Sequence, residues 1–203
     1  MANTQAQFGF KHFGYLSGGS PDYQQSTRAI SKTLATAIGF GDPVIRVSSA
    51  SPYITQGASV TTVPLEGIFV GCTFIPSGGG PPQWSPFWPG NTVNADATAY
   101  VIDAPNALFL VATLQTAVTS ANIGQLINYT TGVPSTSGQG YAIATIDQST
   151  LATTSTGTTI SGLPFRITGL YPGIGNGSDP TTNYNWAIVT FNNQINRSPG
   201  GGY

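Results

Sequence analysis

Charged residues are scarce in this sequence. Only 6% of its 203 residues are Asp, Glu, Lys or Arg, against roughly 25% in a typical soluble domain. The formal net charge is −1, which gives no electrostatic case for a direct nucleic-acid partner. Because a free monomer normally stays soluble through surface charge, we expect an assembly to cover much of the surface. The alternative is a secreted or cell-surface β protein covered by Thr, Ser and Asn.

Histidine and cysteine each occur once, as His12 and Cys72. A Ser-His-Asp or Cys-His arrangement would have to use His12, and a lone cysteine provides neither a disulfide framework nor a metal knuckle. We expect Cys72 to be a small buried hydrophobe. The seven acidic residues are scattered along the chain, which does not favour paired catalytic carboxylates. The sequence therefore predicts no catalytic residues, no cofactor and no metal site, and a protein that is not an enzyme.

Long hydrophobic runs are also missing. No run approaches the roughly 20 apolar residues of a membrane-spanning helix. Residues 1–10, MANTQAQFGF, lack the basic and apolar regions of a secretory signal. We expect a protein that is made in the cytoplasm without a signal peptide and that has no membrane partner.

Short apolar runs make up much of the chain. They are rich in β-branched and aromatic residues and are punctuated by Gly, Pro, Asn and Asp, a pattern typical of strands. Expected strands lie at residues 44–47, 58–63, 68–75, 98–102, 107–111, 126–129, 141–146, 163–170 and 186–192. The predicted fold class is all-β, an antiparallel barrel or sandwich of jelly-roll type. We expect at most one or two short helices, including a helical turn within residues 117–124, and a surface loop at residues 150–161.

The first 50 residues differ from the rest. Four aromatics within eight residues need another surface to cover them, and the alternation of these aromatics shifts phase at Lys11 and His12. Residues 26–38 allow either a short helix or an extended arm. The predicted organisation is an extended N-terminal arm at residues 1–50, a β-barrel or sandwich body at 51–196 and a flexible tail at 197–203.

An aromatic loop at residues 77–91 contains Trp84, Phe87 and Trp88. Together with Trp186 and Tyr184, the tryptophans could stack on sugar rings, which is the usual use of exposed tryptophan in a β-sandwich lectin. In the alternative that we favour, Trp186 is a core residue, while Trp84 and Trp88 plug a barrel end or a subunit interface.

Several stretches, in order, resemble the capsid cement or decoration proteins of tailed bacteriophages, which are also called minor head proteins. The resembling stretches are GIFVGCTF at residues 67–74, FWP at 87–89, AYVIDAP at 99–105 with LF at 108–109, STLATTS at 149–155, LPFRITGL at 163–170 and WAIVTFNN at 186–193. The resemblance covers roughly residues 60–194. It implies a structural virion protein on the outer capsid surface that bridges major capsid proteins against the pressure of packed DNA.

The resemblance implies two partners, the major capsid protein and further copies of this chain, with a homotrimer favoured over a dimer. Residues 1–50 would then be the tether. Its expected contacts with the capsid or a neighbouring protomer are Phe8, Phe10, Lys11, Phe13, Tyr15, Tyr23, Arg28 and Lys32. Trp84, Phe87 and Trp88 are the expected interface or sugar-stacking residues.

The alternative function is a carbohydrate-binding module of a phage tail, fibre or cell-surface protein. That alternative predicts that Trp84, Trp88 or Trp186 is exposed. The decoration hypothesis would be weakened if residues 1–50 packed wholly onto their own body and left no apolar surface exposed.

Overall fold

The computed structural model describes residues 2–22, 24–48, 51–59, 63–90, 93–134, 140–152 and 162–196. This part of the chain is built from strands, with one short 3₁₀ turn, η1 (Ser120–Asn122). The strands are β1 (Lys11–Tyr15), β2 (Ser26–Ile30), β3 (Pro43–Arg46), β4 (Ile54–Gln56), β5 (Gly67–Phe74), β6 (Gln83–Ser85), β7 (Ala97–Ile102), β8 (Ala107–Ala112), β9 (Leu126–Thr130), β10 (Thr145–Ala152), β11 (Phe165–Leu170) and β12 (Trp186–Phe191).

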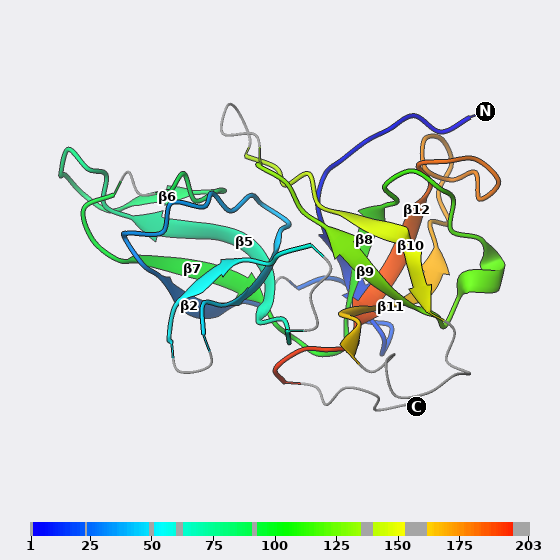
Figure 1. Cartoon of the computed structure of the whole chain (residues 1–203), viewed down its shortest axis with the longest axis horizontal. Helices are drawn as coiled ribbons and strands as arrows, with labels where there is room; N and C mark the ends of the chain where they lie inside the picture. The colour runs from blue at the N-terminus through cyan, green and yellow to red at the C-terminus, as the bar shows by residue number, and fades with distance from the viewer. Residues whose placement is uncertain are drawn as a thin grey trace.

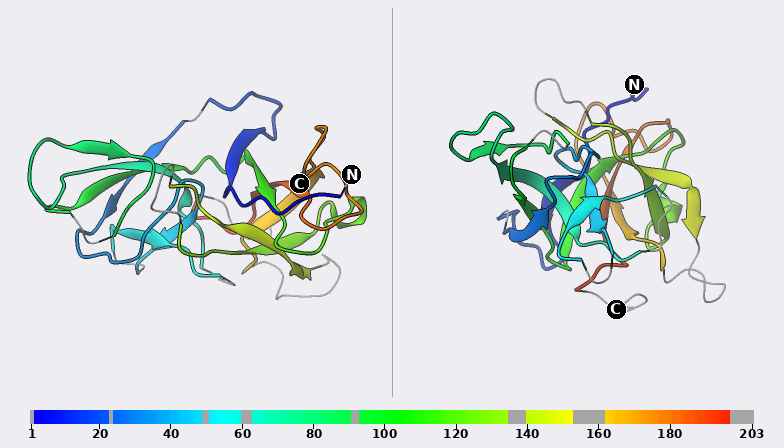
Figure 2. Two further views of the ribbon diagram at one scale, coloured as in Figure 1. Left: turned by 90° about the horizontal axis from the view of Figure 1, so that it is seen from above. Right: turned by 60° about the vertical axis from the view of Figure 1, so that its left-hand side comes forward.

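The strands form two antiparallel sheets. Sheet A has the order β1-β8-β12-β11-β9-β10, and sheet B has the order β2-β7-β5-β3-β4 with β6 paired to β5. Each order has two free ends, so neither sheet closes into a barrel. The predicted all-β fold is therefore confirmed, and the two sheets are consistent with a sandwich. They form two lobes along the long axis of the molecule (Figures 1 and 2).

Strand β5 supplies both hydrophobic cores. Ile68 and Val70 point into core A, which is formed mainly by sheet A and whose largest members are Phe10, Phe109, Tyr129, Phe165 and Phe191. Phe69 and Cys72 point into core B, which is formed by sheet B and its loops. Core B contains Ile30, Ile38, Val44, Ile54, Phe69, Cys72, Trp88, Val93, Ala97, Ala99 and Val101. Burial raises the pKa of the Cys72 thiol to about 12, so this residue acts as a small hydrophobe.

The described residues of the segment 1–50 are part of the body, so the predicted separate arm is wrong. Strand β1 pairs with β8 in sheet A, β2 pairs with β7 in sheet B, and β3 lies between β4 and β5. The aromatic residues of this segment find their covering surface on the same chain, since Phe10 is buried in core A. The phase shift at Lys11 and His12 coincides with a register shift between His12 and Gly14.

The N-terminal residues before β1 are also held by sheet A. The Asn3 side chain donates from Nδ2 to the carbonyl of Asp179 (2.8 Å), and its Oδ1 accepts the backbone N–H of Gly177 (2.9 Å). Thr4 and Asn176 exchange two further hydrogen bonds. Residues 3 and 4 are therefore hydrogen-bonded to the loop between β11 and β12.

Other boundaries differ from the expectations. Residues 26–38 contain β2 and a turn rather than a helix, and β10 extends to Ala152 into the expected surface loop. Strands β4 and β6 were not predicted. The expected strand at 58–63 has no strand in its described residues, and residues 60–62, the rest of the surface loop from residue 153 to 161 and the tail at 197–203 lie outside the described part of the chain. The helical turn expected within residues 117–124 is confirmed as η1.

A buried carboxyl group links the two sheets. Asp42 is fully buried, and its Oδ2 accepts hydrogen bonds from the Gly39 N–H (2.7 Å) and from Nε2 of Gln56 (2.8 Å). The same Gln56 nitrogen donates to the carbonyl of Gly132 (2.9 Å), just beyond β9. Oδ1 of Asp42 has no hydrogen-bond partner among the described residues. Burial raises the pKa of Asp42 to about 7, although the two hydrogen bonds oppose that rise.

We expect Asp42 to make the fold less stable as the pH rises. The folded pKa lies above the unfolded value of about 3.9, so the folded state binds the proton more tightly. This contribution is fully present below pH 4 and is lost as the pH rises through about 7. Asp42→Asn cannot ionise, so its stability relative to the wild type should increase between pH 4 and pH 8, by on the order of a few kcal/mol.

Urea unfolding at pH 4, 6 and 8 measures this difference. Burial lowers the pKa of His12 and gives the opposite slope, which cancels because both proteins carry His12. Parallel stability curves for the variant and the wild type would show that Asp42 does not change its protonation state in this range.

Candidate functional site

The aromatic loop at residues 77–91 separates its three large side chains. Trp84 lies in β6 opposite Thr73 of β5 and is 62% exposed. Its indole lies over Gly71, where an added Cβ would come within 3.0 Å of the ring and where φ is +139°. The glycine therefore leaves room for the indole to rest on β5. One part of Trp84 is supported, and most of its surface faces solvent.

Trp88 is a core residue, so its predicted role in an interface or in sugar stacking is wrong. It is fully buried in core B, where its Nε1 donates to the carbonyl of Leu34 (3.2 Å) and its ring meets Phe74 edge-on. Phe87 is half-buried and packs so closely on Gly140 that a Cβ there would lie 2.2 Å from its ring. Only Trp84 of the three presents a large free aromatic surface.

Trp186 is half-buried at the start of β12 and is not part of either core. Its ring lies 5.0 Å from Phe8 and 5.0 Å from Tyr171, centre to centre. The expectation of a core residue is therefore only partly met. Because Phe8 covers this tryptophan, Phe8 has an intramolecular partner rather than the expected partner on another chain.

The other residues of the predicted tether have different environments. Phe10 is 1% exposed and stacks on Phe165 at 4.5 Å, so its assignment as a contact residue is wrong. The Tyr15 hydroxyl donates to Asp22. Phe13, Lys11 and Lys32 are exposed, although the Lys11 ammonium also lies 4.9 Å from the centre of the Phe8 ring. Tyr23 lies outside the described residues.

Arg28 belongs to an ion-pair cluster that was not predicted. Its Nε donates to Glu66 Oε2 (2.7 Å) and its Nη2 to Asp103 Oδ2 (2.9 Å), while Arg46 Nε donates to the other oxygen of Glu66. Burial lowers the pKa of Arg28, but its bonds with Glu66 and Asp103 outweigh this effect and raise it. Arg28 already has two acidic partners on its own chain, so it is not the free cation that its expected contact with the capsid or a neighbouring protomer assumed.

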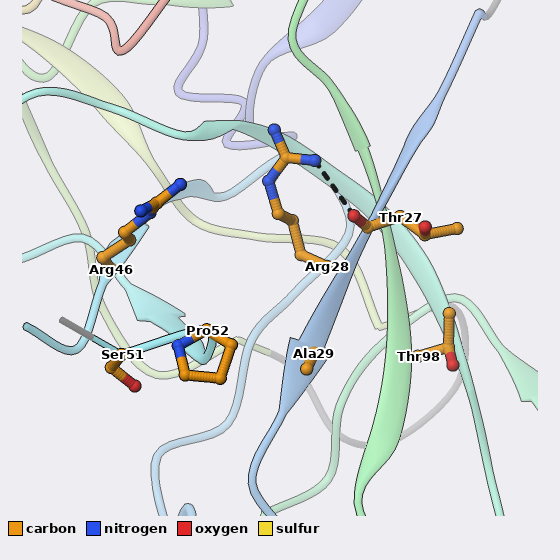
Figure 3. Close-up of a pocket in the computed structure, with 7 residues that line it drawn as sticks. All are labelled: Thr27, Arg28, Ala29, Arg46, Ser51, Pro52 and Thr98. Carbon is orange, nitrogen blue, oxygen red and sulfur yellow. Dashed lines mark hydrogen bonds between the residues drawn. The ribbon is translucent and has the colours of Figure 1, made fainter. Parts of the chain in front are cut away.

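A shallow pocket of about 810 Å³ adjoins this cluster. It lies where the two ends of sheet B approach each other, since Ala29 of β2 forms an isolated bridge with Tyr53 next to β4. The lining residues are Thr27, Arg28, Ala29, Arg46, Ser51, Pro52 and Thr98. Figure 3 shows the side chains of Arg28 and Arg46 leaning toward each other from two sides of this pocket.

The described residues contain neither a metal-binding cluster nor a membrane-spanning helix. They contain no group of three or more His, Cys, Asp or Glu side chains that could hold a metal ion. Among the same residues, no helix has the length and apolar character needed to cross a bilayer.

No protein-family model, curated protein sequence or solved structure matches the chain. The features that bear on its function are therefore those of its own structure: the exposed Trp84, the ion-pair cluster and the pocket beside it.

Phe10 and Phe13 provide a matched test of whether the N-terminal segment is structural. Replacing the buried Phe10 by Ala should lower the free energy of unfolding by about 3–5 kcal/mol, because it leaves a cavity among three other rings of core A. Phe13→Ala removes a ring that is 38% exposed and should cost less than about 1 kcal/mol. Urea denaturation of both variants measures the two values. Equal small losses would mean that residues 1–15 do not contribute to the core in solution.

Proposed function

We propose that this chain is a structural protein of a tailed-phage virion. It binds the outer surface of the head as a decoration protein, bridges neighbouring major capsid proteins and stabilises the capsid against the pressure of packed DNA. The observation that carries the proposal is the exposure of large apolar side chains at both ends of an elongated, charge-poor β body.

One of these side chains belongs to each lobe. Trp84 is 62% exposed in the hairpin formed by β5 and β6, and Ile174 is fully exposed in the loop between β11 and β12. These two segments lie at opposite ends of the long axis (Figure 1). Aromatic and large aliphatic side chains that are exposed in this way gain free energy when a partner covers them. Contacts at two ends would allow one copy to touch two capsid subunits.

The N-terminal segment has a smaller part in this proposal than the sequence suggested. Residues 1–50 pack onto their own body, which meets half of the condition that would weaken the decoration hypothesis. The other half is not met, because apolar side chains remain exposed in the hairpin and loop tips. Binding therefore uses those tips, with Phe13 as the exposed aromatic of the N-terminal segment. Association of three copies over a three-fold position remains the proposed assembly, with a dimer as its alternative.

Binding to heads should depend on the exposed side chains at the two ends. We expect the purified chain to co-sediment with expanded heads that were assembled without it. Trp84→Ala and Ile174→Ser should each weaken this binding about tenfold, since losing a buried anchor costs on the order of 1–2 kcal/mol.

The matched control is Val47→Ser, which changes an apolar residue that is 56% exposed but lies in neither tip. It should bind like the wild type. Failure of the wild-type chain to bind heads would contradict the proposal, and equal binding by all three variants would contradict the assignment of the contact residues.

The exposure of Trp84 also favours a second candidate function, a carbohydrate-binding module. An indole supported on one side by β5 and open on the other could stack on a sugar ring. In that case the isolated chain should bind immobilised glycans, Trp84→Phe should retain part of the binding, and Trp84→Ala should remove it. Binding to heads without binding to glycans favours the decoration protein.

A further inference from the structure

The ion-pair cluster presents its positive charges outward and its negative charges inward. The side chains of Arg28 and Arg46 are 21% and 41% exposed, whereas those of Glu66 and Asp103 are 1% and 16% exposed. The two arginines line the pocket between the two ends of sheet B, and neither carboxylate lines it. Although the four charges cancel, a group that enters this pocket meets the two guanidinium groups first.

Arg46 still has hydrogen-bond donors to offer. Its Nε is bound to Glu66, but its two Nη groups have no hydrogen-bond partner among the described residues. The hydroxyl groups of Thr27, Ser51 and Thr98 line the same pocket. A planar guanidinium with both Nη groups free matches the two oxygens of a carboxylate.

We propose that this pocket binds a carboxylate, and that its occupant is an acidic side chain on the surface of the partner to which the chain docks. Arg46 donates to the carboxylate through its two Nη groups. The occupant part of this inference rests on the proposed function, whereas the carboxylate site itself does not.

A singly charged carboxylate fits the pocket better than a phosphate group. Glu66 lies directly behind both guanidinium groups and already balances one of their charges. A second negative charge on the ligand would therefore face an unfavourable interaction with Glu66, which is 1% exposed and poorly screened by water. Arginine also pairs with carboxylates through two parallel hydrogen bonds, which gives the docked partner a defined orientation.

The site is tested on the full-length chain by nuclear magnetic resonance. The arginine side-chain N–H signals are followed during titration with sodium acetate, with sodium phosphate and with sodium chloride at the same ionic strength. Acetate should produce a saturable shift of the Arg46 signals at lower concentration than phosphate, and chloride should produce none. Equal shifts with acetate and chloride would overturn the proposal.

Three variants make this test specific. Arg46→Gln removes the guanidinium group, and Thr98→Glu places a competing carboxylate in the pocket wall. Each should weaken acetate binding at least tenfold. The matched control is Lys32→Gln, which removes an exposed positive charge from the turn after β2 but does not line the pocket, and it should bind acetate within twofold of the wild type. Unchanged binding by Thr98→Glu would overturn the site even if Arg46→Gln proved unstable.

Binding to heads separates this inference from the proposed function. Thr98→Glu should weaken co-sedimentation with heads about tenfold, whereas Val47→Ser, which changes a residue outside the pocket, should not. If Thr98→Glu loses acetate binding but still binds heads, the occupant of the pocket is not an acidic side chain of the head. The proposed decoration role would then be unaffected. Acetate binding by a chain that does not bind heads would support the site and contradict the proposed function.

Discussion

The structure depends on one strand that is buried on both faces. Because β5 contributes Ile68 and Val70 to core A and Phe69 and Cys72 to core B, neither core can form without it. This is why residues 67–74 read as an almost continuous apolar run rather than as an alternating one. The only glycine within this run after the first residue, Gly71, is the place where Trp84 crosses the strand. The same strand therefore joins the lobes and supports the exposed tryptophan.

Two of the few charged residues that the structure describes are buried. Its one glutamate is buried between two of its six basic residues, and one of its six aspartates, Asp42, is buried between the sheets. Burying a charge is unfavourable unless it is paired, and the Arg28–Glu66–Arg46 cluster provides such pairing next to the pocket between the two ends of sheet B. The other charged side chains of the described residues are at least partly exposed, and their small number fits a surface that a partner covers.

The strands that the sequence predicted are those whose signal is local. Strands β5, β7, β8, β9 and β12 coincide with apolar runs of the sequence. The turn η1 coincides with a short, more polar segment between β8 and β9. Pairing between strands that lie far apart in the sequence leaves no such local signal. Strand β1 pairs with β8, almost one hundred residues later, so its aromatics looked like an uncovered arm. Arg28 lies 38 residues from Glu66 and therefore looked like a free cation. Trp84 and Trp88 share one loop, and only the pairing of β6 with β5 decides which of them is exposed.

Incorporation of the N-terminal segment changes how the protein would bridge two partners. A flexible tether can reach contact points at many distances, but ordering it on binding costs conformational entropy for each residue. A body whose two cores share β5 holds the hairpin of one lobe and the loop of the other at a set separation. Such a spacer binds well only where two sites lie at the matching distance. Under the proposed function, a preformed spacer would favour the capsid lattice whose subunits repeat at that spacing over other arrangements of the same subunits.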